Sequence, residues 1–255
     1  MNNRTQALYC DWGTTNLRAY LVDGERVIDD YSSDQGLFAA RQTGFETVLA
    51  NVRKDMGIEV SVPVYLSGMV GSKHGWIEAP YAATPVSLKS MAQNFVDVAD
   101  GVRLFGGVCH TQENGCRDVM RGEEVQVFGV LGQYPNATQV CLPGTHSKWV
   151  HTEAGKIVSL SSWITGDLFE SLIQKSIFKE QVGSTEFIPA SFDQGVDASG
   201  VAGPLLNSLF HLRSDYLFGK VEKESFHSYL SGFLIGSEIN EVADSTAIVA
   251  PPQSR

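Results

Sequence analysis

The feature that most constrains the fold is a short segment that occurs twice. Residues 7–28, ALYCDWGTTNLRAYLVDGERVI, contain an apolar strand, a Gly-Thr-Thr turn, an alternating strand, an Asp23-Gly24 hairpin and a third strand. Residues 138–159, TQVCLPGTHSKWVHTEAGKIVS, repeat this order, with the hairpin at Ala154-Gly155. Each segment therefore predicts a three-stranded β-meander.

The two segments align without a gap at an offset of 131 residues, measured from Gly13 to Gly144. A repeat of such a long period implies two similar domains, and 255 residues are enough for both. The alternative explanation of the repeat is chance similarity between two ordinary hairpins, since glycine is common in turns. We predict an α/β protein with domains at residues 1–135 and 136–255. The aligned pairs are Cys10 with Cys141, Gly13 with Gly144, Thr14 with Thr145, Gly24 with Gly155 and Val27 with Val158.

The two glycine turns are candidate phosphate sites. A glycine without Cβ lets backbone N–H groups approach phosphate oxygens, and hydroxyl groups add donors. Two such turns facing a cleft would hold the triphosphate of ATP between two domains. For Lys148 a solvated strand lysine is the alternative. The candidates are Gly13, Thr14 and Thr15 in the first turn and Gly144, Thr145, His146, Ser147 and Lys148 in the second.

Asp11 ends the first strand, whereas the second repeat has Leu142 at that position. Magnesium keeps several of its water ligands and needs only one or two carboxylates. We therefore expect Asp11 to hold Mg²⁺ through water, and the second turn to contribute phosphate contacts without a metal ligand.

Between the repeats, a short strand over 65–68 enters a glycine turn that is followed by Lys73, His74 and Trp76. Lys73 could bind a substrate carboxylate, together with N–H groups around residues 71–72, and Trp76 could pack on a sugar carbon face. The alternative is an ordinary connection with a surface histidine. The candidate substrate residues are Ser67, Gly68, Met69, Gly71, Ser72, Lys73 and Trp76.

Asp118 is the candidate general base. We expect it at the start of the helix that includes the run VQVFGVLGQY and leads to the second turn, where a carboxylate could accept the proton of an attacking hydroxyl. The alternative is a helix N-cap, a role that aspartate often fills. Residues 162–172 and 229–239 predict further helices, and Gly232 and Gly236 predict close helix packing.

The charge composition limits the kinds of partner that the protein can bind. A net charge of −10, from 19 Lys and Arg against 29 Asp and Glu, argues against nucleic-acid and anionic-membrane surfaces. The N-terminus lacks a signal-peptide pattern, so we expect a cytoplasmic protein. Cys10 and Cys141 lie in apolar strands, and we expect no disulfide. Cys109, His110 and Cys116 match no standard zinc spacing. A symmetric homo-oligomer is possible for an enzyme of this size.

Six segments in order resemble the 2-dehydro-3-deoxygalactonokinase family. The resemblance implies two actin-like (ribonuclease H-like) ATPase domains with a nucleotide cleft between them. It also implies ATP-dependent phosphorylation of the 6-hydroxyl of 2-dehydro-3-deoxy-D-galactonate, a sugar acid of galactonate breakdown, with Asp118 in the place of the catalytic aspartate. The segments are DWGTTNLRAYLV (11–22), LSGMVGSKHGWIEAPY (66–81), RDVMRGEEVQVFGVL (117–131), LPGTHSKWV (142–150), SSWITGDLFESL (161–172) and YLSGFLIGSEI (229–239).

The resemblance also implies a later helical segment with an adenosine-binding glycine loop, whereas this sequence stops at residues 250–255 after the apolar run 246–249. Either the chain is shortened or it contacts adenine differently. Two alternative functions remain open. One is a kinase of the same fold for another sugar or sugar acid, and the other is an ATP-dependent clamp or sensor without a small-molecule acceptor.

Overall fold

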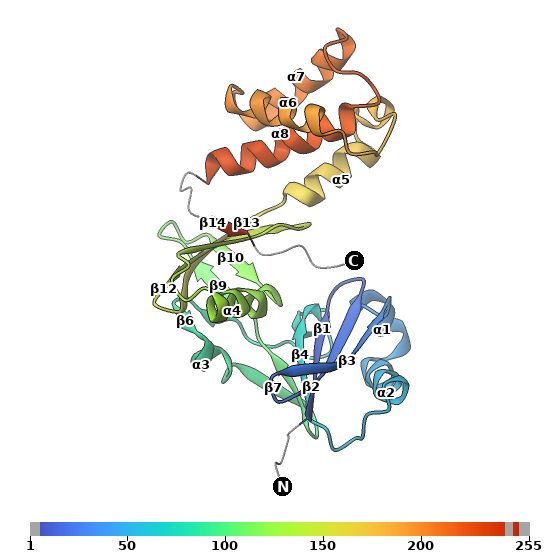
Figure 1. Ribbon diagram of the computed structural model, residues 1–255, viewed down its shortest axis with the longest axis vertical. Coiled ribbons are helices and arrows are strands. Elements are labelled where there is room, and N and C mark those ends of the chain that lie inside the picture. Colours follow the sequence, from blue (N-terminus) through green and yellow to red (C-terminus); the bar gives the residue numbers. More distant parts are fainter. Residues whose placement is uncertain (1–5, 243–246, 250–255) are drawn as a thin grey trace. The chain divides into compact units, whose positions relative to one another are not determined.

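The computed structural model describes residues 6–242 and 247–249 (Figure 1). The stretch 250–255, on which the question of the adenosine loop depends, lies outside the described residues. By its internal contacts the chain divides into two compact units. Among the described residues, the first comprises 6–140 and 149–161, and the second comprises 141–148, 162–242 and 247–249.

The first unit is built on a six-stranded sheet with the order β3-β2-β1-β4-β8-β7. Strands β1, β2 and β3 run antiparallel, which confirms the first predicted meander, and β1–β4 and β4–β8 are parallel pairs. The carboxyl ends of β1 and β4 therefore lie at one edge. The strands are β1 (Gln6–Trp12), β2 (Leu17–Asp23), β3 (Arg26–Ser33), β4 (Val64–Gly68), β7 (Phe95–Ala99) and β8 (Val102–Phe105).

Successive side chains of β1 point alternately to the two faces of this sheet. Leu8, Cys10 and Trp12 are buried in one core cluster with residues of helices α1 (Leu37–Thr43) and α2 (Phe45–Asp55). Burying a large apolar side chain of this kind contributes about 1.5–3 kcal/mol. On the other face Tyr9 stacks on Tyr65 of β4, with ring centroids 5.1 Å apart.

The rest of the first unit carries the predicted base. Strand β10 (Arg117–Met120) pairs with β9 (Val108–Thr111), and β9 pairs with β5 (Ala82–Ala83). Asp118 therefore lies on a strand, and both the expected place on a helix and the alternative that it caps a helix are wrong. Helix α4 (Glu123–Gln133) begins after Gly122, whose φ of 106° only glycine adopts readily. The 3₁₀ turn η1 (Met69–Gly71) follows β4, and α3 (Leu88–Met91) follows β6 (Val86–Ser87).

The second meander is confirmed as well. Strands β11 (Gln139–Leu142), β12 (Ser147–Glu153) and β13 (Lys156–Trp163) lie in a five-stranded sheet with the order β14-β11-β12-β13-β6. Strand β14 is Ala247–Val249. The hairpin glycines of the two repeats share a left-handed conformation, with φ of 66° at Gly24 and 72° at Gly155. We retain the boundary at 135/136 as a proposal for the repeated halves, since α4 ends at Gln133 and β11 begins at Gln139.

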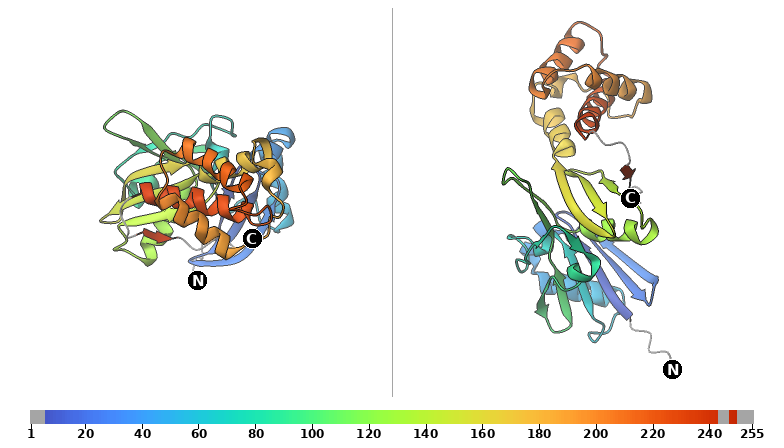
Figure 2. Two further views of the ribbon diagram at one scale, coloured as in Figure 1. Left: turned by 90° about the horizontal axis from the view of Figure 1, so that it is seen from above. Right: turned by 90° about the vertical axis from the view of Figure 1, so that its left-hand side faces the viewer.

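The second unit continues as helices, of which α5 and α8 were predicted. Helices α6 and α8 lie side by side (Figure 2), and a Cβ built on Gly232 would meet the Phe192 carbonyl oxygen at 2.0 Å. The glycines of α8 thus serve packing, as predicted. No helix in the described part of the chain has the length and apolar character to cross a membrane. The elements are α5 (Thr165–Lys175), η2 (Lys179–Gln181), α6 (Pro189–Gly200), α7 (Leu205–Leu217) and α8 (Phe226–Glu241).

Candidate active site

Backbone hydrogen bonds from the start of α1 hold the first turn in place. The carbonyl oxygens of Gly13, Thr14 and Thr15 accept N–H groups of residues 36–38 at 2.9–3.3 Å, and the Gly13 N–H donates to Asn16 O at 2.9 Å. Within the described part of the chain, the N–H groups of Thr14 and Thr15 have no acceptor. The turn thus keeps donors for an anion while its carbonyl oxygens are bonded to the helix.

The second turn is supported in the same way by the start of α5. Thr145 O accepts the Asp167 N–H at 2.9 Å, and the exposed imidazole of His146 lies 3.8 Å from the Asp167 carboxylate. A Cβ built on Gly144 would have no neighbour within 4 Å. The space beside Gly144 is therefore open to a ligand.

One glycine in each half makes this support possible. A Cβ on Gly36 would lie 2.3 Å from the Thr15 carbonyl carbon, and a Cβ on Gly166 would lie 2.6 Å from Gly144 O. Neither distance is possible for a real Cβ, so both helices can approach their turns only because a glycine stands there. Sequence alignment at a fixed offset of 131 misses this pair, since Gly36 and Gly166 are 130 residues apart.

Ser147 and Lys148, two predicted phosphate ligands, are only 5% exposed. The Ser147 hydroxyl donates to both carboxylate oxygens of Glu238 at 2.7 Å, and the Thr165 hydroxyl donates to the same carboxylate. Lys148 Nζ donates to His146 O at 3.1 Å. Lys148 is therefore not a solvated lysine, and the Ser147 hydroxyl is engaged within the protein. Sequence reasoning missed Glu238, although an acidic residue in an apolar helix was a signal.

Asp11 lies at the carboxyl end of β1, opposite Arg18 of β2 and Ser67 of β4. Burial raises the pKa of its carboxyl group, Arg18 lowers it, and the nearby Glu123 raises it again. A buried carboxylate beside a second one favours a bound cation, and this fits the one or two carboxylates that Mg²⁺ uses with water and phosphate oxygens. The described residues hold no cluster of three or more His, Cys, Asp and Glu that could enclose a metal.

The start of α4 packs directly on this strand end. A Cβ on Gly122 would lie 3.2 Å from Gly68 Cα and 3.9 Å from Asp11 Oδ1, so glycine permits the contact. Both oxygens of Glu124 accept the Gly122 N–H, at 2.9 and 2.8 Å, and Ser67 Oγ lies 3.4 Å from Oε1. Burial raises the Glu124 pKa to about 8. Sequence reasoning treated this glutamate only as part of a charged helix start.

The predicted substrate segment forms a compact loop. The Ser72 N–H donates to Met69 O at 3.0 Å, so this N–H cannot also serve a carboxylate, and the Ser72 hydroxyl is buried without a partner among the described residues. Lys73 and His74 are exposed. Trp76 stacks on Phe45 with ring centroids 6.0 Å apart, so one ring face is already covered.

Arg121 anchors this loop from the β10–α4 connection. Its Nη2 donates to Ala79 O at 2.8 Å, its guanidinium lies 4.2 Å from the Tyr81 ring centroid, and a Cβ on Gly71 would lie 3.0 Å from Nη1. Ala79 N donates to Gly71 O at 3.0 Å, which closes the loop at its base. Arg121 therefore ties the substrate candidates to the segment that carries Asp118.

Asp118 accepts a hydrogen bond from Gln112 Nε2 at 2.8 Å and lies opposite His110 in the β9–β10 ladder. His110 Nδ1 lies 2.8 Å from the Thr84 hydroxyl. The carboxylate is partly exposed on a short hairpin. Gln112 therefore holds one oxygen of a carboxylate that is partly exposed to solvent.

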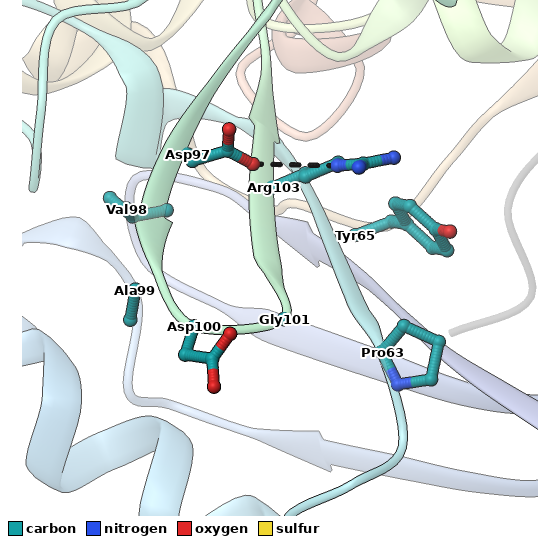
Figure 3. A pocket seen from close by; sticks show the side chains of 8 residues that line it. All are labelled: Pro63, Tyr65, Asp97, Val98, Ala99, Asp100, Gly101 and Arg103. Carbon is teal, nitrogen blue, oxygen red and sulfur yellow. Dashed lines mark hydrogen bonds and ion pairs between the residues drawn. The ribbon is translucent and has the colours of Figure 1, made fainter.

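A cavity of about 630 Å³ lies at the opposite end of the first sheet (Figure 3). Figure 3 shows the exposed Asp97–Arg103 ion pair, with an Nε–Oδ1 distance of 3.4 Å, beside Tyr65. Pro63 precedes β4, whereas Asp11 pairs with Ser67, roughly 10 Å further along the strand. This cavity is therefore not the site of the glycine turns. Its lining residues are Pro63, Tyr65, Asp97, Val98, Ala99, Asp100, Gly101 and Arg103.

Together the fold and the site define a mixed α/β protein with a duplicated strand-turn-strand unit, in which each glycine turn is backed by the start of a helix. The family model for 2-keto-3-deoxy-galactonokinase matches residues 11–252. The chain belongs to this kinase family, as its sequence predicted.

The relatives agree with this assignment. The chain is 32% identical to the 2-dehydro-3-deoxygalactonokinase of Escherichia coli (strain K12), over 93% of this chain and 80% of that protein. It is also 32% identical to a Rhizobium meliloti (strain 1021) protein assigned as DgoK1, over 90% of this chain and 78% of that one. A crystal structure from Sinorhizobium meliloti assigned to the same kinase superposes with a TM-score of 0.84 at 29% identity, over 94% of this chain and 81% of that one. The mixed α/β fold is therefore the fold of this kinase family.

Proposed function

We propose that the protein is an ATP-dependent kinase that phosphorylates the 6-hydroxyl of 2-dehydro-3-deoxy-D-galactonate. The observation that carries the proposal is the repeated turn backed by a helix start, found in a chain that belongs to the galactonokinase family. Backbone N–H groups at a helix-backed turn suit phosphate oxygens. The names of the relatives support the sugar acid.

In this proposal the first turn binds phosphate through the N–H groups of Thr14 and Thr15, and the second turn binds through Gly144, Thr145 and His146. Asp11 holds Mg²⁺ through water, with Glu123 adding negative charge beside it. Bound Mg²⁺ supplies positive charge that stabilises the transferring phosphoryl group. Ser147 supports the second turn through its bond to Glu238.

Asp118 orients the substrate hydroxyl and accepts its proton. The hydroxyl oxygen forms a bond to the γ-phosphorus, the bond from that phosphorus to the β–γ bridging oxygen breaks, and ADP leaves with the electron pair. Gln112 keeps the carboxylate in one orientation. The exposed Lys73 remains our proposed partner for the substrate carboxylate, and Ser67–Ser72 with Trp76 form the surrounding loop.

The test is product identification. The purified protein is incubated with Mg-ATP and 2-dehydro-3-deoxy-D-galactonate, and ³¹P–¹H NMR locates the phosphate. We expect an ester at the 6-oxygen and one ADP per ester. If another aldonic or deoxy-keto acid reacts faster, the substrate assignment is wrong, and if ADP forms without any acceptor, the protein is an ATPase clamp.

The Asp118→Asn variant tests the base. The amide keeps the shape of the side chain but accepts no proton, so turnover should fall about 10²–10⁴-fold. Mg-ATP binding, measured by calorimetry, should stay within a few-fold. Asp97→Asn on the exposed ion pair is the matched control and should keep full activity. An Asp118→Asn enzyme with normal turnover would remove Asp118 from the mechanism.

A further inference from the structure

Glu238 joins three parts of the second unit at one carboxylate. It lies on α8, is 7% exposed, and accepts hydrogen bonds from Ser147 Oγ, at 2.7 Å to each of its oxygens, and from Thr165 Oγ1. Ser147 begins β12 directly after the second turn, and Thr165 is the first residue of α5. The carboxylate on α8 therefore links the first residue of β12 to the first residue of α5.

A carboxylate suits this contact better than a carboxamide. Burying a charge costs several kcal/mol unless hydrogen-bond donors compensate for the lost water, and here two hydroxyl groups do so. An ionised carboxylate only accepts, so both hydroxyl hydrogens must point toward Glu238. A carboxamide at this position would have one acceptor oxygen, and its NH₂ group would meet a hydroxyl instead of accepting from it.

The contact also determines the shape of the turn. Gly166, next to Thr165, packs against Gly144 O, and the Asp167 N–H donates to Thr145 O at 2.9 Å. Movement of Thr165 would carry these two neighbours with it. The exposed residues between Gly144 and His146 are thus fixed from one side by Ser147 and from the other by the start of α5.

We propose that Glu238 is a positioning residue that holds the second turn in the conformation that binds nucleotide phosphates. Glu238 does not touch the nucleotide, and it acts through Ser147 and Thr165. That the ligand is a nucleoside triphosphate rests on the proposed function. The two hydroxyls act as one unit with the carboxylate, so removing any member should weaken the same interaction.

Nucleotide binding without the sugar acid tests this inference. Mg-ATP and Mg-ADP are titrated by calorimetry into the wild type and into the Glu238→Ala, Glu238→Gln, Ser147→Ala and Thr165→Val variants. Glu241→Gln is the matched control, because Glu241 is exposed and lies three residues further along the same helix. Thermal melts without ligand report the stability of each variant.

We expect Glu238→Ala to weaken nucleotide binding by about 10- to 100-fold, since displacements near 1 Å can cost 100-fold in a positioned site. Glu238→Gln, Ser147→Ala and Thr165→Val should each lose less, and Glu241→Gln nothing. Adding Ser147→Ala to Glu238→Ala should cost little more, because the pair is coupled. In turnover assays the KM for Mg-ATP should rise while the KM for the sugar acid stays constant.

Two results would overturn the inference. If the Glu238 variants melt at lower temperature but bind nucleotide like the wild type, the residue is merely structural. If Ser147→Ala and Glu238→Ala add independently, the hydroxyl and the carboxylate are not one unit. Should Glu238→Ala fail to fold, Glu238→Gln and Thr165→Val decide by the same criteria. A wild type that binds neither nucleotide would refute the proposed function, whereas normal wild-type binding with unaffected variants refutes only the inference.

Discussion

The two glycine turns share a backbone plan but differ in the carboxylate beside them. In the first, Asp11 lies at the carboxyl end of β1 and is partly buried near Glu123. In the second, the equivalent position is the buried Leu142, and the Glu238 carboxylate accepts hydrogen bonds from the hydroxyl groups of Ser147 and Thr165. The two carboxylates therefore differ in their neighbours, since Asp11 lies near a second carboxyl group and Glu238 accepts from two hydroxyl groups.

The two turns show which features a duplicated unit keeps and which features differ between its copies. Both halves keep the features that the backbone requires, namely the turn glycine, the hairpin glycine and the glycine at the start of the supporting helix. The residues that carry charge have diverged. Backbone geometry is thus common to both turns, and in the proposed function the metal role belongs to the first turn alone.

The largest expected effect comes from removing the charge of the first turn. Asp11→Asn should lower kcat about 10²–10³-fold, since the loss of one electrostatic stabiliser typically costs this much. The Mg²⁺ concentration needed for half-maximal rate should rise as well. Leu142→Met at the equivalent position is the control and should change kcat little. Equal losses in the two variants would show that the turns do not divide the work.

The supporting glycines should matter equally in both halves. Gly36→Ala and Gly166→Ala each force a Cβ into turn backbone at 2.3–2.6 Å, and overpacking of this kind costs about 1–3 kcal/mol. Denaturant unfolding measures the loss. Gly132→Ala, on the exposed side of α4 with no atom near its Cβ, is the control and should not destabilise. A tolerated Gly36→Ala beside a damaging Gly166→Ala would mean that only the second turn depends on close helix support.

Gly144→Ala separates binding from folding. Its Cβ would have no protein neighbour within 4 Å, so the melting temperature should stay within a few degrees of the wild type. The methyl group would occupy the space that we assign to phosphate, so the KM for Mg-ATP should rise about 10-fold, equivalent to roughly 1.4 kcal/mol. Unchanged KM with unchanged stability would place the phosphates elsewhere.

The last prediction is a pH dependence of stability in the first unit. The Glu124 pKa rises from its ordinary value of 4.5 to about 8 in the folded protein. Between these values the folded state keeps a proton that the unfolded state has released, so the stability present below pH 4.5 is lost as the pH rises through 8.

The Glu124→Gln variant, which resembles the protonated form, should flatten this slope between pH 5 and about 8 by less than about 1.4 kcal/mol per pH unit. Urea unfolding at several pH values measures it. Glu123→Gln on the partly exposed neighbour is the comparison. A wild type whose stability rises with pH in this window would contradict the assignment.

Sequence reasoning located both meanders because alternation and hairpin glycines are local properties of the chain. It placed Asp118 on the helix that leads to the second turn, whereas the structure places it on β10, with Val119, Met120, Arg121 and the left-handed Gly122 between it and α4. It missed Glu238 and Glu124, since Glu238 bonds to Ser147, 91 positions away, and Glu124 is buried against a strand end that includes Ser67, 57 positions away. No spacing rule connects residues at such separations.

By itself, the sequence determined the repeated strand-turn-strand unit, the difference between Asp11 and Leu142, and the kinase family. These depend on residue type and on short-range backbone preference. Only the tertiary structure decided that Ser147 donates to Glu238, that Ser72 N–H is already bonded, and that Gly36 and Gly166 support the turns. The physical reason is that hydrogen bonds and close contacts depend on where distant segments meet, and folding alone brings those segments together.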